Sequence, residues 1–367
     1  MTTLAPRTQH PYYMYEAIAA QPDAIRSVIS TQKERCAEVA EVLSQKRRIY
    51  VVGIGTSWHA ALAGASIMEA GQMEAGPMDA GPEAFACNSF EFCVSPPRVT
   101  ADDAVIVISH RGTKRSSYDA LDVAKDLGAY TVAITSTDPG PRIQVADVGI
   151  RTVDQEKSAA FTISYTTALT VLALLNLGIA GRLDDPTNGL DALPQQVADI
   201  LDAEADVRTV VAEHRLRRRF ISAGWGANRA NAYEVALKIK ETSRADCEGF
   251  QTEQLLHGPF CSLDSDCMLT LIAPAGEDRG RSVDLAKAAR ELGSPVWALT
   301  NRGDAGLADA GAVTFPLPDC PAYLMPIASV VPLQLFTYHL ALARGTHPDL
   351  FQQDDPLQAA ARTHYDL

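Results

Sequence analysis

Short apolar segments of strand length alternate with helix-length segments twice along the chain. The apolar runs hold four or five residues each and lie at 48–52, 104–108, 130–134, 220–223, 268–272 and 296–299. Segments with helical patterning lie at about 58–70, 119–127, 228–242 and 282–292. This alternation is typical of parallel sheets that helices cover on both faces. It predicts an α/β protein of two tandem doubly wound domains, each with a mostly parallel sheet flanked by helices.

The two halves also match at the level of single residues. Ala124-Lys-Asp-Leu-Gly128 in the first half corresponds to Ala289-Arg-Glu-Leu-Gly293 in the second. Each half ends in a charge-free stretch, at 158–181 and at 320–343. These stretches are long enough to span a membrane, but hydroxyl residues in the first and prolines in the second favour buried helices. The predicted parts are an N-terminal arm and helix (1–30), the first domain (31–182), a linker (183–210), the second domain (211–344) and a C-terminal tail (345–367).

A glycine-rich turn follows the first predicted strand. Gly53-Ile-Gly55-Thr56-Ser57 places two hydroxyls and a helix start at the carboxyl end of a strand, where ligands of open α/β sheets bind. Glycines let the backbone approach an anion, and a helix start presents unpaired N–H groups. Two interpretations remain open: a phosphate site at Gly55, Thr56 and Ser57, or a tight turn alone. A dinucleotide fingerprint is disfavoured because its third glycine is missing.

A second loop, after the apolar run at 104–108, is rich in cations and hydroxyls. Its residues are Ser109, His110, Arg111, Gly112, Thr113 and Lys114. A solvated turn with a hydroxyl helix cap would explain this composition. We favour anion binding, because we expect the first glycine-rich turn to end nearby in space.

Glu234, Lys238 and Glu241 lie at i, i+4 and i+7, on one face of a predicted helix. A solvated row of ion pairs would have the same spacing, and for Glu234 and Lys238 that interpretation remains open. Glu241 is followed sixteen residues later by His257-Gly-Pro259. A carboxylate that moves a proton between adjacent carbons, and an imidazole that opens a sugar ring, would form a reaction centre. The pair therefore predicts Glu241 and His257 as catalytic residues.

Composition narrows the class of protein further. A net charge of −13 argues against nucleic acid or an anionic membrane surface as a partner. The seven cysteines are an odd number without Cys-x-x-Cys spacing, so neither a structural zinc site nor a disulfide framework is expected. The first thirty residues hold no apolar signal core, which predicts a cytoplasmic protein.

Taken together, the motifs resemble the SIS (sugar isomerase) family over residues from about 13 to 350. They look most like the isomerase half of the glutamine–fructose-6-phosphate aminotransferases and their stand-alone relatives. The segments that carry the resemblance are Met14-Tyr-Glu-Ala-Ile-Ala-Ala-Gln-Pro22, 53–57, 160–172, 234–241, 257–259 and 331–342. The resemblance implies phosphate bound by the 53–57 and 109–114 loops, with Glu241 as the base between C1 and C2. It also implies a homodimer with a shared site, because the ring-opening histidine, here His257, comes from the neighbouring subunit in those relatives.

Three departures from the family pattern stand out. Arg111 and Lys114 replace hydroxyl residues of the family's Ser-x-Ser-Gly-x-Thr loop. Ala159 and Phe161 are predicted substrate contacts, and Phe161 stands where relatives carry a serine. The last lysine of the chain is Lys287, so the Schiff base that the synthases form with a tail lysine is not expected.

The expected function is an isomerase or deaminase of a hexosamine 6-phosphate that needs no metal and no organic cofactor. Glucosamine 6-phosphate would give fructose 6-phosphate and ammonia, or would be isomerised alone. Glu253 and His347 are possible supporting groups. Two alternatives remain open: a deglycase that releases an amino acid from a fructosamine 6-phosphate, and a non-catalytic phosphosugar sensor.

Overall fold

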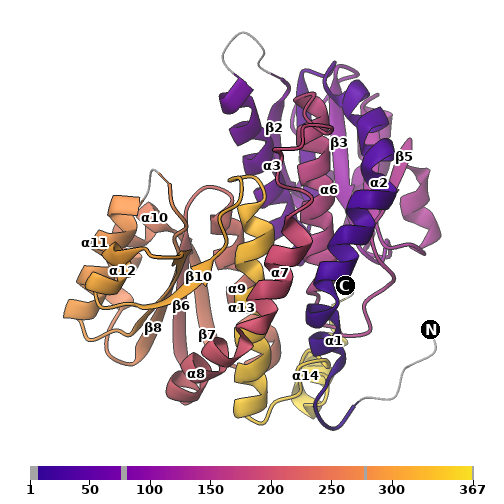
Figure 1. Ribbon diagram of the computed structural model, residues 1–367. Helices are drawn as coiled ribbons and strands as arrows, with labels where there is room; N and C mark the ends of the chain where they lie inside the picture. The colour runs from indigo at the N-terminus through magenta and orange to yellow at the C-terminus, as the bar shows by residue number, and fades with distance from the viewer. Residues whose placement is uncertain (1–6, 76–80, 277–278, 366–367) are drawn as a thin grey trace.

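The computed structural model describes residues 7–75, 81–276 and 279–365. In this part of the chain two five-stranded sheets form, and every strand pair in them is parallel. Figure 1 shows the sheets as two lobes with long helices between them. The predicted α/β class with two doubly wound domains is confirmed.

The first sheet is formed by residues 48–151. Its strands are β1 (Arg48–Gly53), β2 (Glu83–Asn88), β3 (Asp103–Ile108), β4 (Tyr130–Thr135) and β5 (Val148–Arg151), in the spatial order β2-β1-β3-β4-β5. The connecting segments are α3 (Thr56–Ala75), α4 (Ser89–Val94), α5 (Arg115–Asp126), the 3₁₀ turn η1 (Pro141–Val145) and α6 (Ile163–Ile179). Alternate strand residues enter opposite layers, as the pleat requires: Ile106 belongs to the core on the α3 and α6 side, and Val107 to the core on the α5 side.

The second sheet repeats this plan. Its strands are β6 (Arg219–Gly224), β7 (Asp246–Gln251), β8 (Cys267–Ile272), β9 (Val296–Asn301) and β10 (Val313–Leu317), in the spatial order β10-β9-β8-β6-β7. The connecting segments are α9 (Asn228–Ser243), α10 (Thr252–Leu256), η2 (Pro259–Ser262), α11 (Arg279–Glu291), α12 (Ala305–Asp309) and α13 (Met325–Ala343). In both sheets the first strand lies between the second and the third, which places a topological switch point at its carboxyl end.

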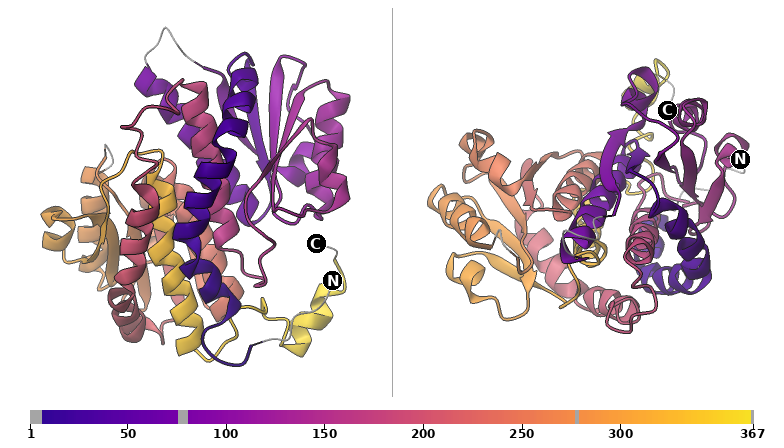
Figure 2. Two further views of the ribbon diagram at one scale, coloured as in Figure 1. Left: turned by 45° about the vertical axis from the view of Figure 1, so that its right-hand side comes forward. Right: turned by 90° about the horizontal axis from the view of Figure 1, so that it is seen from above.

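A shared layer of helices joins the two sheets. It includes α2 (Gln21–Leu43), α6, α7 (Leu193–Asp202), α9 and α13, and one apolar cluster runs through it from the first sheet to the second (Figure 2). Among the described residues, α13 is the one helix long and apolar enough to span a membrane, but 89% of its apolar window is buried inside the protein. The remaining helices are α1 (Tyr13–Ala19), α8 (Glu204–His214) and α14 (Pro356–Arg362). The two charge-free stretches are therefore core helices, α6 and α13, as predicted.

Some predicted boundaries differ from the structure. The boundary at residue 30 falls in the middle of α2, so the N-terminal helix continues into the first domain. The predicted linker 183–210 contains α7 and the first part of α8. The pattern predicts six strands, and the four that it misses (β2, β5, β7 and β10) are the edge strands of the two sheets.

Candidate active site

Helix α9 carries three charged side chains into the interior between the two lobes. Glu234, Lys238 and Glu241 share one helix face, as predicted, and their side chains are only 1%, 2% and 10% exposed. The Lys238 ammonium lies 2.5 Å from Glu241 Oε2 and 3.5 Å from Glu234 Oε1. Glu234, Lys238 and Glu241 are therefore not a solvated row of ion pairs, because the two carboxylates are buried around one ammonium group.

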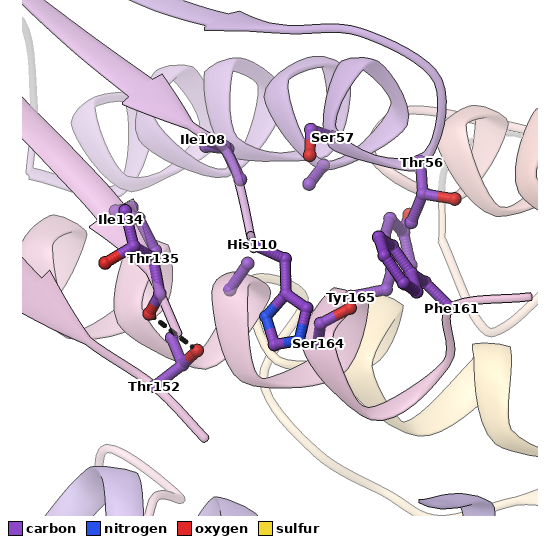
Figure 3. Close-up of a pocket in the computed structure, with 12 residues that line it drawn as sticks. Thr56, Ser57, Ile108, His110, Ile134, Thr135, Thr152, Phe161, Ser164 and Tyr165 are labelled. Carbon is purple, nitrogen blue, oxygen red and sulfur yellow. Dashed lines mark hydrogen bonds between the residues drawn. The ribbon is translucent and has the colours of Figure 1, made fainter. Parts of the chain in front are cut away.

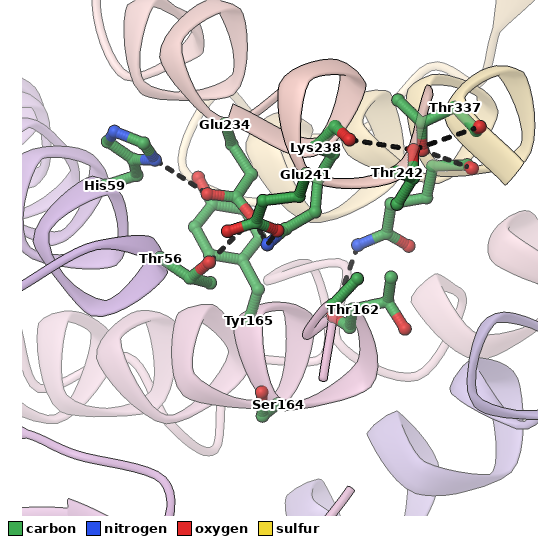
Figure 4. A network of polar contacts seen from close by, with 12 residues as sticks. Thr56, His59, Thr162, Ser164, Tyr165, Glu234, Lys238, Glu241, Thr242 and Thr337 are labelled. Atoms are coloured by element: carbon green, nitrogen blue, oxygen red, sulfur yellow. Dashed lines mark hydrogen bonds and ion pairs between the residues drawn. The ribbon is translucent and has the colours of Figure 1, made fainter. Parts of the chain in front are cut away.

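The same group of charges touches the glycine-rich turn of the first domain. Thr56, the first residue of α3, donates its hydroxyl to Glu234 Oε1 over 3.1 Å. His59 Nδ1 lies 2.6 Å from Glu234 Oε2. Figure 4 shows these side chains of α3 pointing toward the carboxylates of α9. Residues far apart in the sequence thus form one polar network across the two domains.

The two carboxylates of this network ionise differently. Burial raises the pKa of the Glu241 carboxyl, and the negative charge of Glu234 adds to that effect against the opposing charge of Lys238. Burial alone would also raise the pKa of Glu234, but Lys238 and the hydrogen bond with His59 lower it below its usual range. Of the two carboxyls, Glu241 is therefore the one whose protonated form the surroundings favour, and a raised pKa suits a general acid–base group.

A pocket adjoins the network at the carboxyl ends of β3 and β4 (Figure 3). The space between its atoms is about 290 Å³ including the open mouth, but the centre of a water-sized sphere has only about 10 Å³ available to it, so side chains must move before a larger ligand can enter. The polar side chains that line it are Thr56, Ser57, His110, Thr135, Thr152 and Ser164. Two of the lining residues also contact helix α9. Thr56 donates to Glu234, and the Tyr165 hydroxyl donates to Asn231 Oδ1 over 2.8 Å. A ligand that fills this pocket would lie next to the buried charges of α9.

Glycine is required at two points around the pocket. Gly55 has a φ of +60°, in the left-handed region that favours glycine, and so lets the chain turn from β1 into α3. Gly112 has a φ of +64°, and a Cβ there would lie 2.5 Å from Ile143 Cγ2. The second loop can therefore fold back over η1 only with glycine at this position.

Of the six residues predicted in the cation-rich loop, one lines the pocket. His110 lines the pocket, whereas Arg111 and Lys114 do not. The Arg111 guanidinium lies over the Phe161 ring, 4.9 Å from its centroid, and donates to the Glu156 carbonyl oxygen over 3.0 Å. Lys114 is half-buried, and burial together with the charge of Arg111 lowers the pKa of its ammonium. Arg111 therefore lies behind the part of the pocket wall that Phe161 forms and adds positive potential to it.

The remaining residues of the predicted loop and substrate contacts surround this wall. Ser109 is buried and Thr113 exposed, and neither lines the pocket. Phe161 forms part of the lining. The backbone N–H of Ala159 donates a hydrogen bond to the carbonyl oxygen of Asp349, in the C-terminal tail, over 2.9 Å.

His257 lies outside the network within one chain. Its side chain is 70% exposed at the end of α10, and Nε2 lies 3.0 Å from Glu253 Oε1. Glu253 in turn pairs with Arg281, and these two partners lower its pKa to about 2. His347 Nε2 contacts the Arg7 carbonyl oxygen and so ties the tail to the N-terminal arm. Of the possible supporting groups, the structure brings Glu234 and Lys238 to Glu241, but not Glu253 or His347.

Several residues of the site carry no strong signal in the sequence. Glu156 is buried, and its carboxylate accepts from the backbone N–H groups of Thr162 and Ser164 at the start of α6. An acidic residue shortly before a long charge-free helix is a weak hint of such a cap. His59 lies two residues after the glycine-rich turn and four residues, about one helical turn, after Gly55, which is the one spacing that could have suggested it.

The described residues contain no group of three or more His, Cys, Asp or Glu side chains placed to hold a metal ion. All seven cysteines are free thiols. The candidate chemistry of the site thus rests on carboxylates, hydroxyls, imidazoles and one buried ammonium.

Comparisons with known proteins agree with this architecture. The chain is 30% identical over 355 residues to glutamine–fructose-6-phosphate aminotransferase (isomerizing) of Thermococcus kodakarensis, covering 94% of this chain but 58% of that relative. It superposes on the C-terminal domain of glucosamine-fructose-6-phosphate aminotransferase from Francisella tularensis with a TM-score of 0.83 at 19% identity, covering 94% and 99% of the two chains.

A second solved structure, tagatose-6-phosphate ketose/aldose isomerase from Escherichia coli, superposes with a TM-score of 0.76 at 20% identity, over 95% of this chain and 97% of that one. At these identities the two superpositions establish the fold. The model of the SIS domain matches residues 91–177 and 215–344, which together make up more than half of the chain. With two such units in one chain, the protein belongs to the SIS domain family.

Proposed function

We propose that the protein is a metal-independent isomerase or deaminase of a hexosamine 6-phosphate, with Glu241 as the group that moves a proton between C1 and C2. The observation that carries the proposal is the hydrogen bond between Thr56 and Glu234. It joins the glycine-rich turn, which can hold a phosphate, to the helix face that holds Glu241. The names of the aligned relatives, which include isomerising aminotransferases, support a phosphosugar as the substrate class.

The charges at the two ends of the site match an amino-sugar phosphate. Three carboxyl groups, those of Glu234, Glu241 and Glu156, lie around the single ammonium of Lys238, so this end is rich in acceptor oxygens. Burial raises the pKa of Glu241 and of Glu156, whereas Lys238 and His59 keep that of Glu234 low. On the side of the pocket that Phe161 lines, the Arg111 guanidinium over the Phe161 ring adds positive potential. An ammonium group would be stabilised at the first end and a phosphate at the second.

The proposed reaction begins with the open-chain amino aldose. Glu241 removes the proton from C2 and returns it to C1 through an enolamine, while a second proton passes from the amine nitrogen to the oxygen on C1. The C1 aldehyde thereby becomes a hydroxymethyl group and the amine at C2 becomes an imine. Water then adds to the imine carbon and ammonia leaves, which yields fructose 6-phosphate. Proton transfer by a positioned group of this kind contributes about 100- to 10,000-fold to the rate.

We further propose that His257 acts in the site of a second copy of the chain. The His257 ring is exposed, and its partner Glu253 is not part of the network around Glu241. We therefore propose that it assists ring opening across a contact between two copies. The loop that carries it ends in Gly258-Pro259 and is followed by the exposed Cys261. The exposed position of His257 supports this proposal, which requires a homodimer with two shared sites.

The test is to incubate the protein with hexosamine and fructosamine 6-phosphates and to identify ketose phosphate and released amine by mass spectrometry. We expect glucosamine 6-phosphate to give fructose 6-phosphate, and Glu241→Gln to lower kcat by about 100-fold or more. Binding of fructose 6-phosphate should persist in that variant.

Glu291→Gln, an exposed carboxylate at the end of α11, is the matched control and should leave kcat unchanged. Full activity of Glu241→Gln would contradict the proposed role. Release of an amino acid from fructosamine 6-phosphates, without action on glucosamine 6-phosphate, would replace the proposal with a deglycase.

A further inference from the structure

The pocket at the carboxyl ends of β3 and β4 has no room for a ligand larger than a water molecule. The centre of a water-sized sphere has only about 10 Å³ available inside it. The Phe161 ring forms part of its lining, and the residue is only partly buried (Figure 3). We propose that Phe161 is the gate of this pocket, and that rotation of its side chain admits the ligand. The inference concerns access to the pocket and does not depend on the reaction proposed above.

The other large side chains of the lining are fixed. Tyr165 is buried, and its hydroxyl donates to helix α9 over 2.8 Å. The His110 ring accepts a hydrogen bond at Nε2 from the backbone N–H of Glu156 over 2.9 Å. Ile108 and Ile134 belong to the apolar core of the first domain, and the remaining lining residues apart from Phe161 are Ala, Ser or Thr. Phe161 is therefore the large lining side chain that can turn without breaking a hydrogen bond or opening the core.

The main chain on both sides of Phe161 is held in place. The residue lies between β5 and α6, in a segment that forms no helix or strand. The N–H of Ala160 donates to Ser158 Oγ over 3.2 Å, and the N–H of Thr162 donates to the Glu156 carboxylate over 2.9 Å. Opening of the pocket therefore needs a change of one side-chain rotamer and no movement of the segment.

Two contacts hold the Phe161 ring in the closed position. The Arg111 guanidinium lies 4.9 Å from the ring centroid, and a hydrogen bond to the Glu156 carbonyl oxygen over 3.0 Å fixes the arginine there. The His110 and Phe161 rings have their centroids 5.3 Å apart at an interplanar angle of 75°, an edge-to-face arrangement. Contacts of these two kinds are weak enough to break transiently, and together they favour the closed position by roughly 10- to 100-fold.

The gate distinguishes this chain from the family pattern, which has a serine at the position of Phe161. A serine could neither cover the Arg111 guanidinium nor meet the His110 ring, so it would leave the pocket open. With phenylalanine, a ligand enters only during the fraction of time for which the ring is turned away. The apparent affinity for any ligand of the pocket is reduced by that fraction.

A thiol placed inside the pocket reports on the gate without any ligand. Ser57 lines the pocket, and Ser57→Cys puts a sulfur there. Its labelling rate with methyl methanethiosulfonate equals the open fraction multiplied by the rate of a free thiol. We expect slow labelling in Ser57→Cys, and a rate about 10- to 100-fold higher when Phe161→Ala is added. Peptide mass spectrometry measures the rate, with the exposed Cys261 as the internal reference.

Two further variants test whether the effect belongs to the gate. Phe351→Ala is the matched control, because the Arg362 guanidinium covers the Phe351 ring at 4.2 Å in the C-terminal tail and neither residue lines the pocket. It should change the labelling of the engineered thiol by less than about 2-fold. Arg111→Met keeps the Phe161 ring and removes one of its two contacts, so the rate should rise about 3- to 10-fold. This variant decides the question if circular dichroism shows that Phe161→Ala does not fold.

Two results would overturn the inference. Labelling of the engineered thiol as fast as that of Cys261, with Phe161 in place, would show that the pocket is open. A rate that neither Phe161→Ala nor Arg111→Met raises would show that another side chain controls access.

Binding kinetics of fructose 6-phosphate connect the gate to the proposed function. Phe161→Ser should raise the association rate constant about 10- to 100-fold, because the ligand no longer waits for the ring to turn. Labelling that depends on Phe161, without turnover of any hexosamine phosphate, would remove only the proposed function. Turnover with labelling that does not depend on Phe161 would remove only the inference.

Discussion

The two halves of the chain share a backbone turn and differ in the side chains around it. A Cβ at Gly53 would lie 2.2 Å from the Ser57 carbonyl oxygen, and one at Gly224 would lie 2.5 Å from that of Asn228. The next glycines, Gly55 and Gly226, have φ values of +60° and +53°. Strand, turn and helix thus join in the same way in both domains.

The side chains that follow these turns have different partners. In the first half Thr56 and Ser57 face a pocket. In the second half Ala227 brings no hydroxyl, and Asn228 accepts a hydrogen bond from Ser329 over 2.7 Å. The turn of the second domain is therefore occupied by contacts within the protein.

The carboxyl ends of β4 and β9 do not show this contrast, because each has a threonine whose hydroxyl bonds within the protein. Thr135, at the end of β4, lines the pocket, but its hydroxyl donates to the Ser136 carbonyl oxygen over 3.0 Å and accepts from the Arg151 guanidinium. Thr300, near the end of β9, donates to Asp304 over 2.6 Å, and Arg279 pairs with the same carboxylate. The two copies therefore differ at their glycine-rich turns, and the second domain contributes helix α9, which carries Glu241.

The largest expected effect comes from Lys238, the cation that the second domain places between two carboxylates. Lys238→Met would leave Glu234 and Glu241 buried without it, and removal of one partner from a buried pair costs about 3–5 kcal/mol. Both carboxyl pKa values would rise. A carboxyl whose pKa is higher in the folded than in the unfolded protein stabilises the fold below the unfolded pKa, and that stabilisation is lost as the pH rises. The loss in free energy of unfolding caused by Lys238→Met should therefore be greater at pH 8 than at pH 5. Urea unfolding at the two pH values measures it.

The same variant should shift the acid limb of kcat/KM to higher pH, because Lys238 favours the ionised form of Glu241. Glu234→Gln should shift it to lower pH, since the charge of Glu234 raises the pKa of Glu241. Lys287→Met, at an exposed position on α11, is the control for both stability and pH profile. Shifts in the same direction for the two network variants would contradict the assignment of Glu241 as the titrating base.

An effect of intermediate size is expected at the two turns. Ser57→Ala removes a hydroxyl from the pocket and should weaken binding of fructose 6-phosphate by about 10-fold, as expected for a lost hydrogen bond to a charged group. Ala227→Ser adds a hydroxyl to the turn of the second domain and should change binding by less than about 2-fold. Isothermal titration with fructose 6-phosphate measures both. Equal losses at the two turns would mean that the domains share the ligand.

The strands that the sequence predicts and those that it misses differ in burial. The predicted central strands β3 and β8 are buried along their whole length, so each reads as a continuous apolar run. The missed strands β2 and β7 have alternating exposure at their first residues and only partly buried ends. An edge strand needs fewer apolar positions, which leaves only a weak pattern in the sequence.

The site shows a similar limit. Helical spacing was sufficient to place Glu234, Lys238 and Glu241 on one face, because that depends on local geometry alone. The positions of His110 and Arg111 depend on contacts with Phe161 and Glu156, some fifty residues away, and composition alone did not distinguish the two side chains. Whether a loop side chain faces a pocket is set by tertiary packing, which one sequence does not encode in any short motif.

The smallest effect is expected for thiol reactivity at the short helices α4 and α10, which follow the second strand of each half. Asn88 caps α4 and Gln251 caps α10 through their side-chain amides, so the two segments begin alike. They differ in exposure: Cys93 of α4 is half-buried, and burial raises its pKa, whereas Cys261 after α10 is exposed. Cys261 should therefore be the thiol that reacts first with an aromatic disulfide reagent.

If the His257 loop enters the site of a second copy, dimer formation will cover Cys261 as well. We expect its labelling rate to fall a few-fold as the protein concentration passes through the range in which sedimentation shows dimer formation. The rate of Cys93 should stay constant through the same range and serves as the internal control. A Cys261 rate that is independent of concentration, in a protein that does dimerise, would place the contact elsewhere and leave His257 without access to Glu241.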